Sequence, residues 1–351
     1  MIPRIRVLVV DDSALMRQVL STLLARDPAI EIVGSACDPY VARDKIRELQ
    51  PDVLTLDIEM PRMDGLAFLE KLMRVRPMPV VMVSSLTDAG CATTLRALEL
   101  GAVDFVAKPK VDLRERMPEL AQEIIEKIKV AASARVRQRV PAAPVLPYAR
   151  PALPPTPRMT GQVIAVGAST GGTEALRQFL AALPSDAPGV VAVQHMPEEF
   201  TRAFAERLDQ LCTVRVKEAD DGDRVLAGHA LIAPGNRHMR LVRDGALYQV
   251  RLSSEPPVNR HRPAVDVLFQ SCASQAQGNA VGVIMTGMGD DGARGLLAMR
   301  KAGARTLAQD EETCIVFGMP KVAVELGAAD EVLPLSRLAE AALAGARMRT
   351  S

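Results

Sequence analysis

The sequence predicts two α/β domains, each built on a doubly wound parallel sheet. Short continuous apolar runs alternate with amphipathic stretches from residue 5 to about residue 129, and the same alternation resumes at residue 163. Continuous runs are typical of strands that helices cover on both faces. The 351 residues also exceed the roughly 100 to 200 residues of one ordinary domain. We therefore expect one domain over 1–129, a linker over 130–159 and a second domain over 160–351.

The individual elements follow from this alternation. Between the strands, apolar residues recur on one face at helical spacing, and a last helix, carried by Leu120, Ile124 and Ile128, closes the first series. In the second series, Asp244-Gly245 joins two alternating runs and predicts a hairpin that forms an antiparallel edge of the second sheet. The expected helices of the first series are 15–24, 41–48, 65–74 and 92–100. The expected strands are 7–10, 53–56, 80–83 and 103–107, then one from 163, and then 190–194, 214–217, 280–285 and 306–309.

A proline-rich segment separates the two series. Seven prolines lie between Pro141 and Pro157, and residues 127–158 contain no acidic side chain. Proline cannot continue a helix or donate a hydrogen bond to a sheet, so we expect this segment to be a partly extended, basic linker.

Composition excludes several classes of protein. The net charge of +1 gives no electrostatic reason to expect nucleic-acid binding, and no apolar run approaches the ~20 residues of a membrane-spanning helix. The five cysteines are widely spaced and form no Cys-x-x-Cys pair, which argues against a disulfide framework or a zinc site. We expect a cytoplasmic monomer that binds no nucleic acid and does not insert into membranes.

Polar residues follow several strands of the first series at the point where each strand ends. Asp11 and Asp12 follow the first strand, Asp57 follows a later one, Ser84 ends the next, and Lys108 ends the last. The carboxyl ends of parallel strands meet at one edge of a sheet, so the three carboxylates can share a hard cation such as Mg²⁺. For any one residue alone a structural interpretation is preferable, with Asp12 as a helix cap and Lys108 as a surface charge. The five together predict a site for a phosphoryl group.

The second series opens with a strand, a glycine-rich turn and a helix over residues 163–176. Such a turn can cradle a phosphate on the helix N-terminus, or it can display Ser169 at its apex as a nucleophile. A dinucleotide site would need an acidic residue about 20 residues further on, where this chain has Gln194 and His195. No tyrosine is followed four residues later by the lysine that short-chain reductases use, so the reductase interpretation fails.

Three strand ends of the second series carry the residues of a nucleophilic serine site. His195 ends the strand after the one that bears Ser169, and a third strand ends in a glycine-rich turn with Asp290 and Asp291. A histidine can take the proton of the serine, and a carboxylate can hold the imidazole. Each residue also has a structural alternative as a helix cap or a buried histidine, and His261 is the second candidate for the base.

Residues 5–125 resemble a response-regulator receiver domain, which has a flavodoxin-like sheet. The motifs that carry the resemblance are Val9-Val10-Asp11-Asp12-Ser13, Thr55-Leu56-Asp57-Ile58-Glu59-Met60-Pro61 and Lys108-Pro109. The resemblance implies that Asp57 accepts a phosphoryl group from a histidine kinase and that Mg²⁺ is needed. The implied metal ligands are Asp11, Asp12 and Asp57. Lys108 would pair with the phosphoryl group, and Ser84 and Phe105 would respond to it.

Residues 160–345 resemble the catalytic domain of the chemotaxis protein-glutamate methylesterases, the CheB family. Members of this family join a receiver, a linker and a Rossmann-like three-layer domain. The motifs that carry the resemblance are Gly167-Ala168-Ser169-Thr170-Gly171-Gly172, Gln194-His195-Met196-Pro197, Ala233-Pro234-Gly235, His261-Arg262-Pro263-Ala264-Val265-Asp266 and Met285-Thr286-Gly287-Met288-Gly289-Asp290-Asp291-Gly292. Carried over by position, the resemblance makes Ser169 the nucleophile, His195 the base and Asp291 the orienting carboxylate, with no cofactor for the esterase.

The same resemblance implies a substrate and a mode of control. The substrate would be the γ-methyl ester of glutamyl side chains on the cytoplasmic helices of chemoreceptors, and some members also deamidate glutamine there. We expect oxyanion donors on the backbone near Thr170 and Met288. Phosphorylation of Asp57 is expected to activate the esterase by opening access to Ser169. The alternative is a response regulator whose second domain binds a ligand or partner without catalysis. A DNA-binding output is disfavoured, because the sequence shows no helix-turn-helix pattern with a basic face.

Overall fold

The computed structural model describes residues 3–60, 63–85, 87–108, 113–136, 161–245 and 247–347. The chain forms two compact units, Met1–Ala142 and Ala143–Ser351. The linker expected over 130–159 lies outside the described residues from 137 onward. Its first residues still belong to the last helix of the first unit, Leu113–Ser133, in which Ala131 is fully buried.

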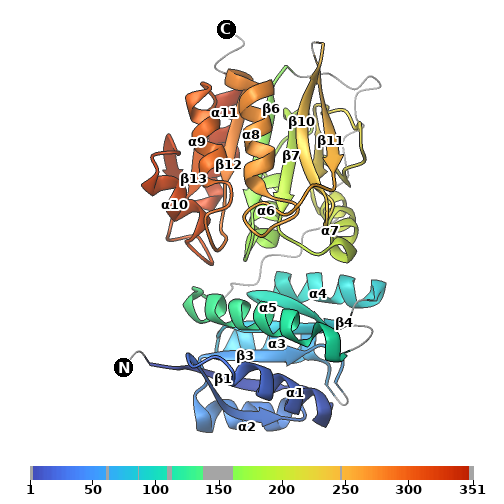
Figure 1. Ribbon diagram of the computed structural model, residues 1–351, viewed down its shortest axis with the longest axis vertical. Helices are drawn as coiled ribbons and strands as arrows, with labels where there is room; N and C mark the ends of the chain where they lie inside the picture. The colour runs from blue at the N-terminus through green and yellow to red at the C-terminus, as the bar shows by residue number, and fades with distance from the viewer. Residues whose placement is uncertain are drawn as a thin grey trace. The chain divides into compact units, whose positions relative to one another are not determined.

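The first unit is a five-stranded parallel sheet with strand order β2-β1-β3-β4-β5 (Figure 1). Its strands are β1 (Ile5–Val10), β2 (Ile30–Ala36), β3 (Val53–Asp57), β4 (Val80–Ser85) and β5 (Asp104–Lys108). Its helices are α1 (Ala14–Leu24), α2 (Pro39–Leu49), α3 (Gly65–Val75), α4 (Asp88–Leu100) and α5 (Leu113–Ser133). The expected flavodoxin-like sheet is confirmed.

Local sequence explains where the helices of the first unit begin. Short polar side chains accept hydrogen bonds from the exposed amides of the first turn: Ser13 from Met16 in α1, and Asp64 from Ala67 in α3. All five residues of β3 are buried, as the continuous apolar run predicted. Ser13 is therefore a helix cap, whereas the preceding Asp11 is fully buried at the carboxyl end of β1.

The second unit is a seven-stranded parallel sheet with strand order β14-β13-β12-β6-β7-β9-β8. Its strands are β6 (Val163–Ala168), β7 (Gly189–Gln194), β8 (Arg215–Glu218), β9 (His229–Ile232), β12 (Ala280–Ile284), β13 (Arg305–Gln309) and β14 (Glu331–Leu333). The short strands β9 and β14 were not expected from the apolar runs.

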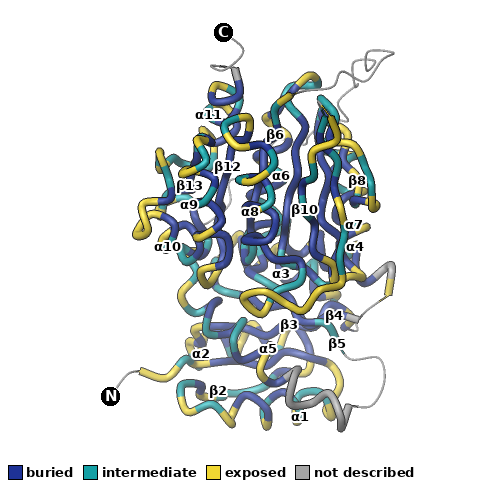
Figure 2. Tube along the Cα trace, turned by 45° about the horizontal axis from the view of Figure 1, so that its top comes forward, coloured by how far each residue is buried: buried dark blue, intermediate teal, exposed yellow. Residues whose placement is uncertain are grey.

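Helices cover both faces of this sheet and complete three layers. The helices are α6 (Gly172–Ala181), α7 (Glu198–Leu211), α8 (Val265–Gln275), α9 (Ala293–Lys301), α10 (Met319–Glu325) and α11 (Leu335–Arg347). Helices α8, α9 and α10 pack together on one face, and α6, α7 and α11 on the other. Strands β6 and β12 run through the buried interior, as Figure 2 shows. Among the described residues, none of the helices is long and apolar enough to cross a membrane.

The predicted hairpin forms, but not at the edge of the main sheet. Strands β10 (His238–Asp244) and β11 (Leu247–Ser253) make a separate two-stranded antiparallel sheet. The outer amides of β10 are satisfied by a helix instead of a strand: Leu241 N donates to Ser271 Oγ (2.8 Å) and Arg243 N to Gln275 Oε1 (3.2 Å), both on α8. Side chains of α8 thus occupy the positions that a neighbouring strand would take.

Strand order places the topological switch point of the second sheet at β6. From β6 the chain runs to β7 on one side and later returns to β12 on the other, so β6 lies between them. In open parallel sheets such a reversal of strand order leaves a crevice at the carboxyl ends of the strands. The residues that follow β6, β7 and β12 therefore share one edge of the sheet.

Candidate active site

The turn after β6 holds Ser169 by its backbone. Ser169 N donates to the Thr286 carbonyl oxygen (3.0 Å), and the Ser169 carbonyl oxygen accepts from Gly172 N (2.6 Å) and Gln194 Nε2 (2.9 Å). Gly171, the N-cap of α6, has φ +76°, in the left-handed region that favours glycine. The backbone of residue 169 is thus anchored to the last residue of β7 and to the turn after β12.

Thr286 connects three turns through hydrogen bonds. Its buried hydroxyl lies 3.0 Å from the Thr170 carbonyl oxygen and 3.2 Å from that of Val316, and it accepts from Val316 N (3.0 Å). Thr286 N donates to Oε1 of the buried Gln309 (2.8 Å). The turns that follow β6, β12 and β13 are therefore held to one another by buried hydrogen bonds.

His195 follows β7 and contacts Asp291 in the turn after β12. His195 Nε2 lies 2.8 Å from Asp291 Oδ2, and the two side chains are 7% and 2% exposed. Because an ionised carboxylate only accepts hydrogen bonds, this contact places a ring proton on Nε2, and in the neutral imidazole it leaves Nδ1 with a lone pair. In serine proteases the orientation is reversed, with Nδ1 bonded to the aspartate.

Each of the two carboxylate oxygens of Asp291 accepts two hydrogen bonds. Oδ2 accepts from His195 and from Val265 N (2.6 Å), and Oδ1 accepts from Asp266 N (3.1 Å) and from Asn259 Nδ2 (2.8 Å). The two amides open α8, whose N-cap residue Ala264 supplies no side-chain cap, so Asp291 caps this helix from outside. Burial raises the pKa of Asp291, but the contacts with His195, Asn259 and Val265 outweigh burial and bring it below its ordinary value.

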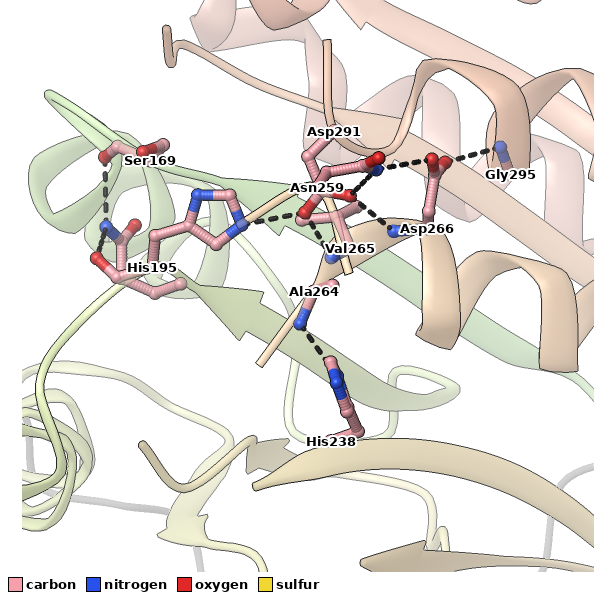
Figure 3. A network of polar contacts seen from close by, with 10 residues as sticks. Ser169, His195, His238, Asn259, Ala264, Val265, Asp266, Asp291 and Gly295 are labelled. Atoms are coloured by element: carbon pink, nitrogen blue, oxygen red, sulfur yellow. Dashed lines mark hydrogen bonds and ion pairs between the residues drawn. The ribbon is translucent and has the colours of Figure 1, made fainter. Parts of the chain in front are cut away.

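Ser169 lies on the other side of the imidazole. Figure 3 shows His195 between Ser169 and Asp291, with the second ring nitrogen on the serine side. Nδ1 of His195 is buried and has no hydrogen-bond partner among the described residues. The structure therefore brings His195 and Asp291 into contact and leaves Nδ1 unpaired on the side of Ser169. The Ser169 hydroxyl could therefore donate to Nδ1 while the hydrogen bond between His195 and Asp291 stays unchanged.

His261 stacks on the face of His195. The ring centroids are 3.7 Å apart and the ring planes differ by 11°. Burial and the neighbouring charge of His195 lower the pKa of His261 to about 4. His261 is therefore a neutral ring at neutral pH, and it lacks the hydrogen bond to Asp291 that His195 makes. The geometry favours His195 over His261 as the base.

Gly287 leaves room for Ser169. A Cβ atom at residue 287 would lie 2.3 Å from Sδ of the fully buried Met319 and 2.7 Å from Ser169 Cβ. We expect Gly287→Ala to destabilise the second unit by about 1–3 kcal/mol, because overpacking forces its neighbours to move. Urea unfolding of the second unit measures this change. Gly161→Ala is the matched control, since a Cβ there meets nothing within 4 Å. Equal free energies of unfolding for the two variants would contradict the crowding.

The structure separates the two candidate carboxylates. Asp291 is buried and bonded to His195, whereas the adjacent Asp290 is exposed. Sequence reasoning did not find Asn259 or Asp266 as parts of this network, although Asp266 stands in one of the motifs. Met288, expected with Thr170 to supply oxyanion donors, directly follows Gly287 and is 47% exposed. Thr170 follows Ser169 on the same turn, and Met288 is one residue from Gly287 on the turn after β12.

The first unit gathers its predicted residues at the carboxyl edge of its sheet. Carboxylate oxygens of Asp11, Asp12 and Asp57 lie within 4.8 Å of one another. Lys108 Nζ lies 2.8 Å from Asp57 Oδ1 and 3.3 Å from Asp11 Oδ2. Burial raises the pKa of Asp57 even though Lys108 opposes it. Lys108 is thus shared between two buried carboxylates, and three carboxylates with one ammonium group suit a hard divalent cation.

The two predicted switch residues lie in buried contacts. Ser84 is fully buried, and Thr94 on α4, which sequence reasoning missed, donates to Ser84 Oγ (2.5 Å). Phe105 is 4% exposed, and Lys127 Nζ lies 5.0 Å from the centroid of its ring. Lys127 also pairs with Asp104 (3.3 Å). Both switch side chains therefore contact helices, Ser84 through α4 and Phe105 through α5.

Comparisons with known proteins agree with both units. The CheB methylesterase family matches residues 164–342, and the response regulator receiver domain matches residues 7–118. A protein-glutamate methylesterase/protein-glutamine glutaminase of Geobacter metallireducens is 59% identical over 95% of this chain and 94% of its own length. One of the same name from Salmonella typhimurium is 58% identical over 97% of each chain.

A solved structure matches the second unit. The crystal structure of the Thermotoga maritima CheB methylesterase catalytic domain is 39% identical and superposes with a TM-score of 0.52. The match covers 53% of this chain and 98% of that domain. Because the family model spans residues 164–342 and relatives of 58–59% identity cover nearly the whole chain, the chain belongs to the CheB methylesterase family.

Proposed function

We propose that this chain is a phosphorylation-activated serine hydrolase that demethylates glutamyl γ-methyl esters on chemoreceptors and deamidates glutamines there. The observation that carries the proposal is the contact of Asp291 with Nε2 of His195, which leaves Nδ1 as the acceptor on the side of Ser169. The names of the relatives, protein-glutamate methylesterase/protein-glutamine glutaminase, support the substrate class.

Ester hydrolysis and glutamine deamidation proceed by the same mechanism. Ser169 Oγ attacks the ester carbonyl carbon while His195 Nδ1 takes the hydroxyl proton. The tetrahedral intermediate collapses, the imidazolium returns that proton to the methoxide, and methanol leaves. Water then attacks the acyl-enzyme by the same proton path and releases the glutamate carboxylate and Ser169. With a glutamine substrate the first leaving group is ammonia. Asp291 keeps the ring in its orientation and stabilises the imidazolium.

Backbone amides near Thr170 and Met288 are the proposed oxyanion donors. Thr170 follows the nucleophile directly, and Met288 follows Gly287, where an added Cβ atom would lie 2.7 Å from Ser169 Cβ. Donors aimed at the developing oxyanion contribute about 10²–10³-fold to kcat in other acyl-transfer enzymes.

Methylated receptor distinguishes the proposed function from a binding-only output domain. We expect purified full-length protein to release methanol from receptor that carries γ-methyl esters, and mass spectrometry to show loss of the methyl groups. Receptor with glutamine at the same positions tests deamidation through release of ammonia. Receptor binding with neither product would favour the non-catalytic alternative.

Asp57 is the proposed phosphorylation site, and a histidine kinase is the proposed phosphodonor. Asp11, Asp12 and Asp57 would hold Mg²⁺, which shields the charge of the incoming phosphoryl group when bound. Lys108, already 2.8 Å from Asp57, would pair with a phosphoryl oxygen, and Ser84 would leave Thr94 to contact it. A histidine kinase and the cytoplasmic helices of chemoreceptors as partners favour the cytoplasm as the place of action. We propose that the protein acts as a monomer, because every residue proposed for this chemistry lies in one chain.

We expect Asp57→Asn to abolish activation without removing basal esterase activity. A phosphodonor with Mg²⁺ should raise methanol release by wild-type protein about 5- to 150-fold, the usual range of allosteric coupling, and leave Asp57→Asn unchanged. Asp52→Asn is the matched control. Asp52 precedes the same strand at its opposite end, where its carboxylate accepts from Arg6 N (2.8 Å). Activation that persists in Asp57→Asn would show that another residue carries the phosphoryl group.

A further inference from the structure

Asn259 joins two buried carboxylates through one amide nitrogen. Its Nδ2 donates to Asp291 Oδ1 and to Asp266 Oδ2, both at 2.8 Å (Figure 3). Asp291 and Asp266 are 1% and 3% exposed. The two hydrogens of one NH₂ group are thus divided between two side chains that would otherwise repel each other.

Asp266 is anchored on its far side as well. Its Oδ1 accepts from Gly295 N (2.6 Å) in the first turn of α9, and burial raises the pKa of Asp266. Asp266 N in turn donates to Asp291 Oδ1. Asp266 therefore connects the start of α8 with the start of α9, and Asn259 closes the path from Asp266 to the carboxylate that holds His195.

The loop that carries Asn259 is fixed independently of this amide. Val258 and His261 exchange two backbone hydrogen bonds, of 3.0 and 2.9 Å, around Asn259. At the end of the loop, Ala264 N donates to Nδ1 of the fully buried His238 (3.2 Å), whose Nε2 lies 3.1 Å from the Pro256 carbonyl oxygen. Asn259 itself has φ +50°, which asparagine and glycine tolerate better than other residues.

We propose that Asn259 is a positioning residue for the hydrolase reaction, which orients the Asp291 carboxylate toward His195 by sharing its amide between Asp291 and Asp266. The inference rests on the proposed function of the Ser169 site. Among the described residues, the Asn259 side chain donates to Asp266 and Asp291 and not to Ser169 or the His195 imidazole, so it acts through Asp291. Without its amide, Oδ1 of Asp291 keeps one donor, and the negative charge of Asp266 acts on Asp291 unshielded.

The charged groups around His195 determine in which direction loss of the Asn259 amide shifts the pH–activity curve. The titratable and charged groups that face it are Asp291, the stacked His261 and, beyond Asn259, Asp266; Arg260 also acts on His261. Without the Asn259 donor, the negative charge of Asp291 is compensated less, and this favours the protonated imidazole. The acid side of the pH–activity curve should therefore move to higher pH.

Asn259→Gly tests the proposal in the full-length protein. We expect kcat for methanol release to fall about 10- to 100-fold with little change in KM, because one hydrogen bond to a charged group is lost in the site and none to substrate. The acid-side midpoint of kcat/KM should rise. Asn236→Gly is the matched control: Asn236 also has φ above zero (+58°), and it holds the same loop through Arg262 (3.0 Å) without touching either carboxylate.

Asn259→Asp separates hydrogen-bond donation from shape. This variant keeps the side-chain volume but replaces the donor by an acceptor, so kcat should fall at least as far as in Asn259→Gly. If Asn259→Asp does not fold, Asn259→Ser carries the same test, because its single hydroxyl hydrogen can serve only one carboxylate. Wild-type kcat and pH dependence in the folded variants would overturn the inference. An inactive wild-type protein would instead refute the proposed function.

Discussion

Replacing Ser169 by alanine is expected to lower methanol release from methylated receptor by about 10⁴-fold or more, as loss of the nucleophile does in other enzymes of this type. Without Oγ no acyl-enzyme forms, and only substrate binding and oxyanion stabilisation remain. Deamidation should fall by the same factor, because ester and amide cleavage share this step. Initial rates of methanol and ammonia release, measured on the same preparation, check both expectations.

The variant should fold normally. The hydrogen bonds that anchor residue 169 come from its backbone, which alanine retains. Phosphorylation of Asp57 in the variant serves as the internal check, since that site belongs to the other unit. Ser274→Ala, at an exposed position of α8, is the matched control and should keep full activity. Residual activity in Ser169→Ala above about one per cent would contradict a covalent mechanism at Ser169.

The edge that carries the site could be predicted from the sequence for a simple reason. Ser169, His195 and Asp291 each follow a buried apolar run, and parallel strands deliver the residues after them to one side of the sheet. The sheet order confirms that the three runs are neighbours, with β6 between β7 and β12. The same reasoning placed Asp11, Asp57 and Lys108 together in the first unit. The catalytic roles of these residues stay predictions.

The contacts made by the irregular segment before α8 could not be predicted. Asn259 and His261 lie in an irregular segment without periodicity, and Asn259 reaches Asp291 across 32 positions of sequence. No local pattern indicates such a contact. The position of the hairpin was wrong for a related reason: whether a strand joins a sheet depends on what else can satisfy its amides, and here the side chains of Ser271 and Gln275 do so.

The choice of ring nitrogen also depends on tertiary structure. A sequence shows that a histidine and an aspartate can meet, but not which nitrogen meets the carboxylate. Here Asp291 accepts from four donors, two of them in the first turn of α8. The three donors other than His195 orient the carboxylate so that Oδ2 meets Nε2 of His195. The tautomer that makes His195 a base at Nδ1 is therefore set by the packing of α8 against the turn after β12.

Asp291→Asn is expected to reduce kcat about 10³- to 10⁴-fold, the cost of the wrong histidine tautomer in a serine triad. All four partners of Asp291 are donors, so an amide must turn its NH₂ group against two of them in either orientation. With the NH₂ group toward His195, Nε2 must accept and the ring proton moves to Nδ1. Nδ1 then faces Ser169 as a donor and cannot take its proton. The kcat for methanol release at neutral pH measures this loss.

Asp290→Asn provides the control for the same chemical change one residue earlier. Asp290 is exposed and makes no contact with His195, so this variant should retain wild-type kcat and KM. In Asp291→Asn, KM should also stay near its wild-type value, because the carboxylate does not contact substrate and its loss acts on the proton-transfer step. If Asp290→Asn lost activity while Asp291→Asn kept it, the exposed carboxylate would be the functional one, and the buried contact would serve only to cap α8.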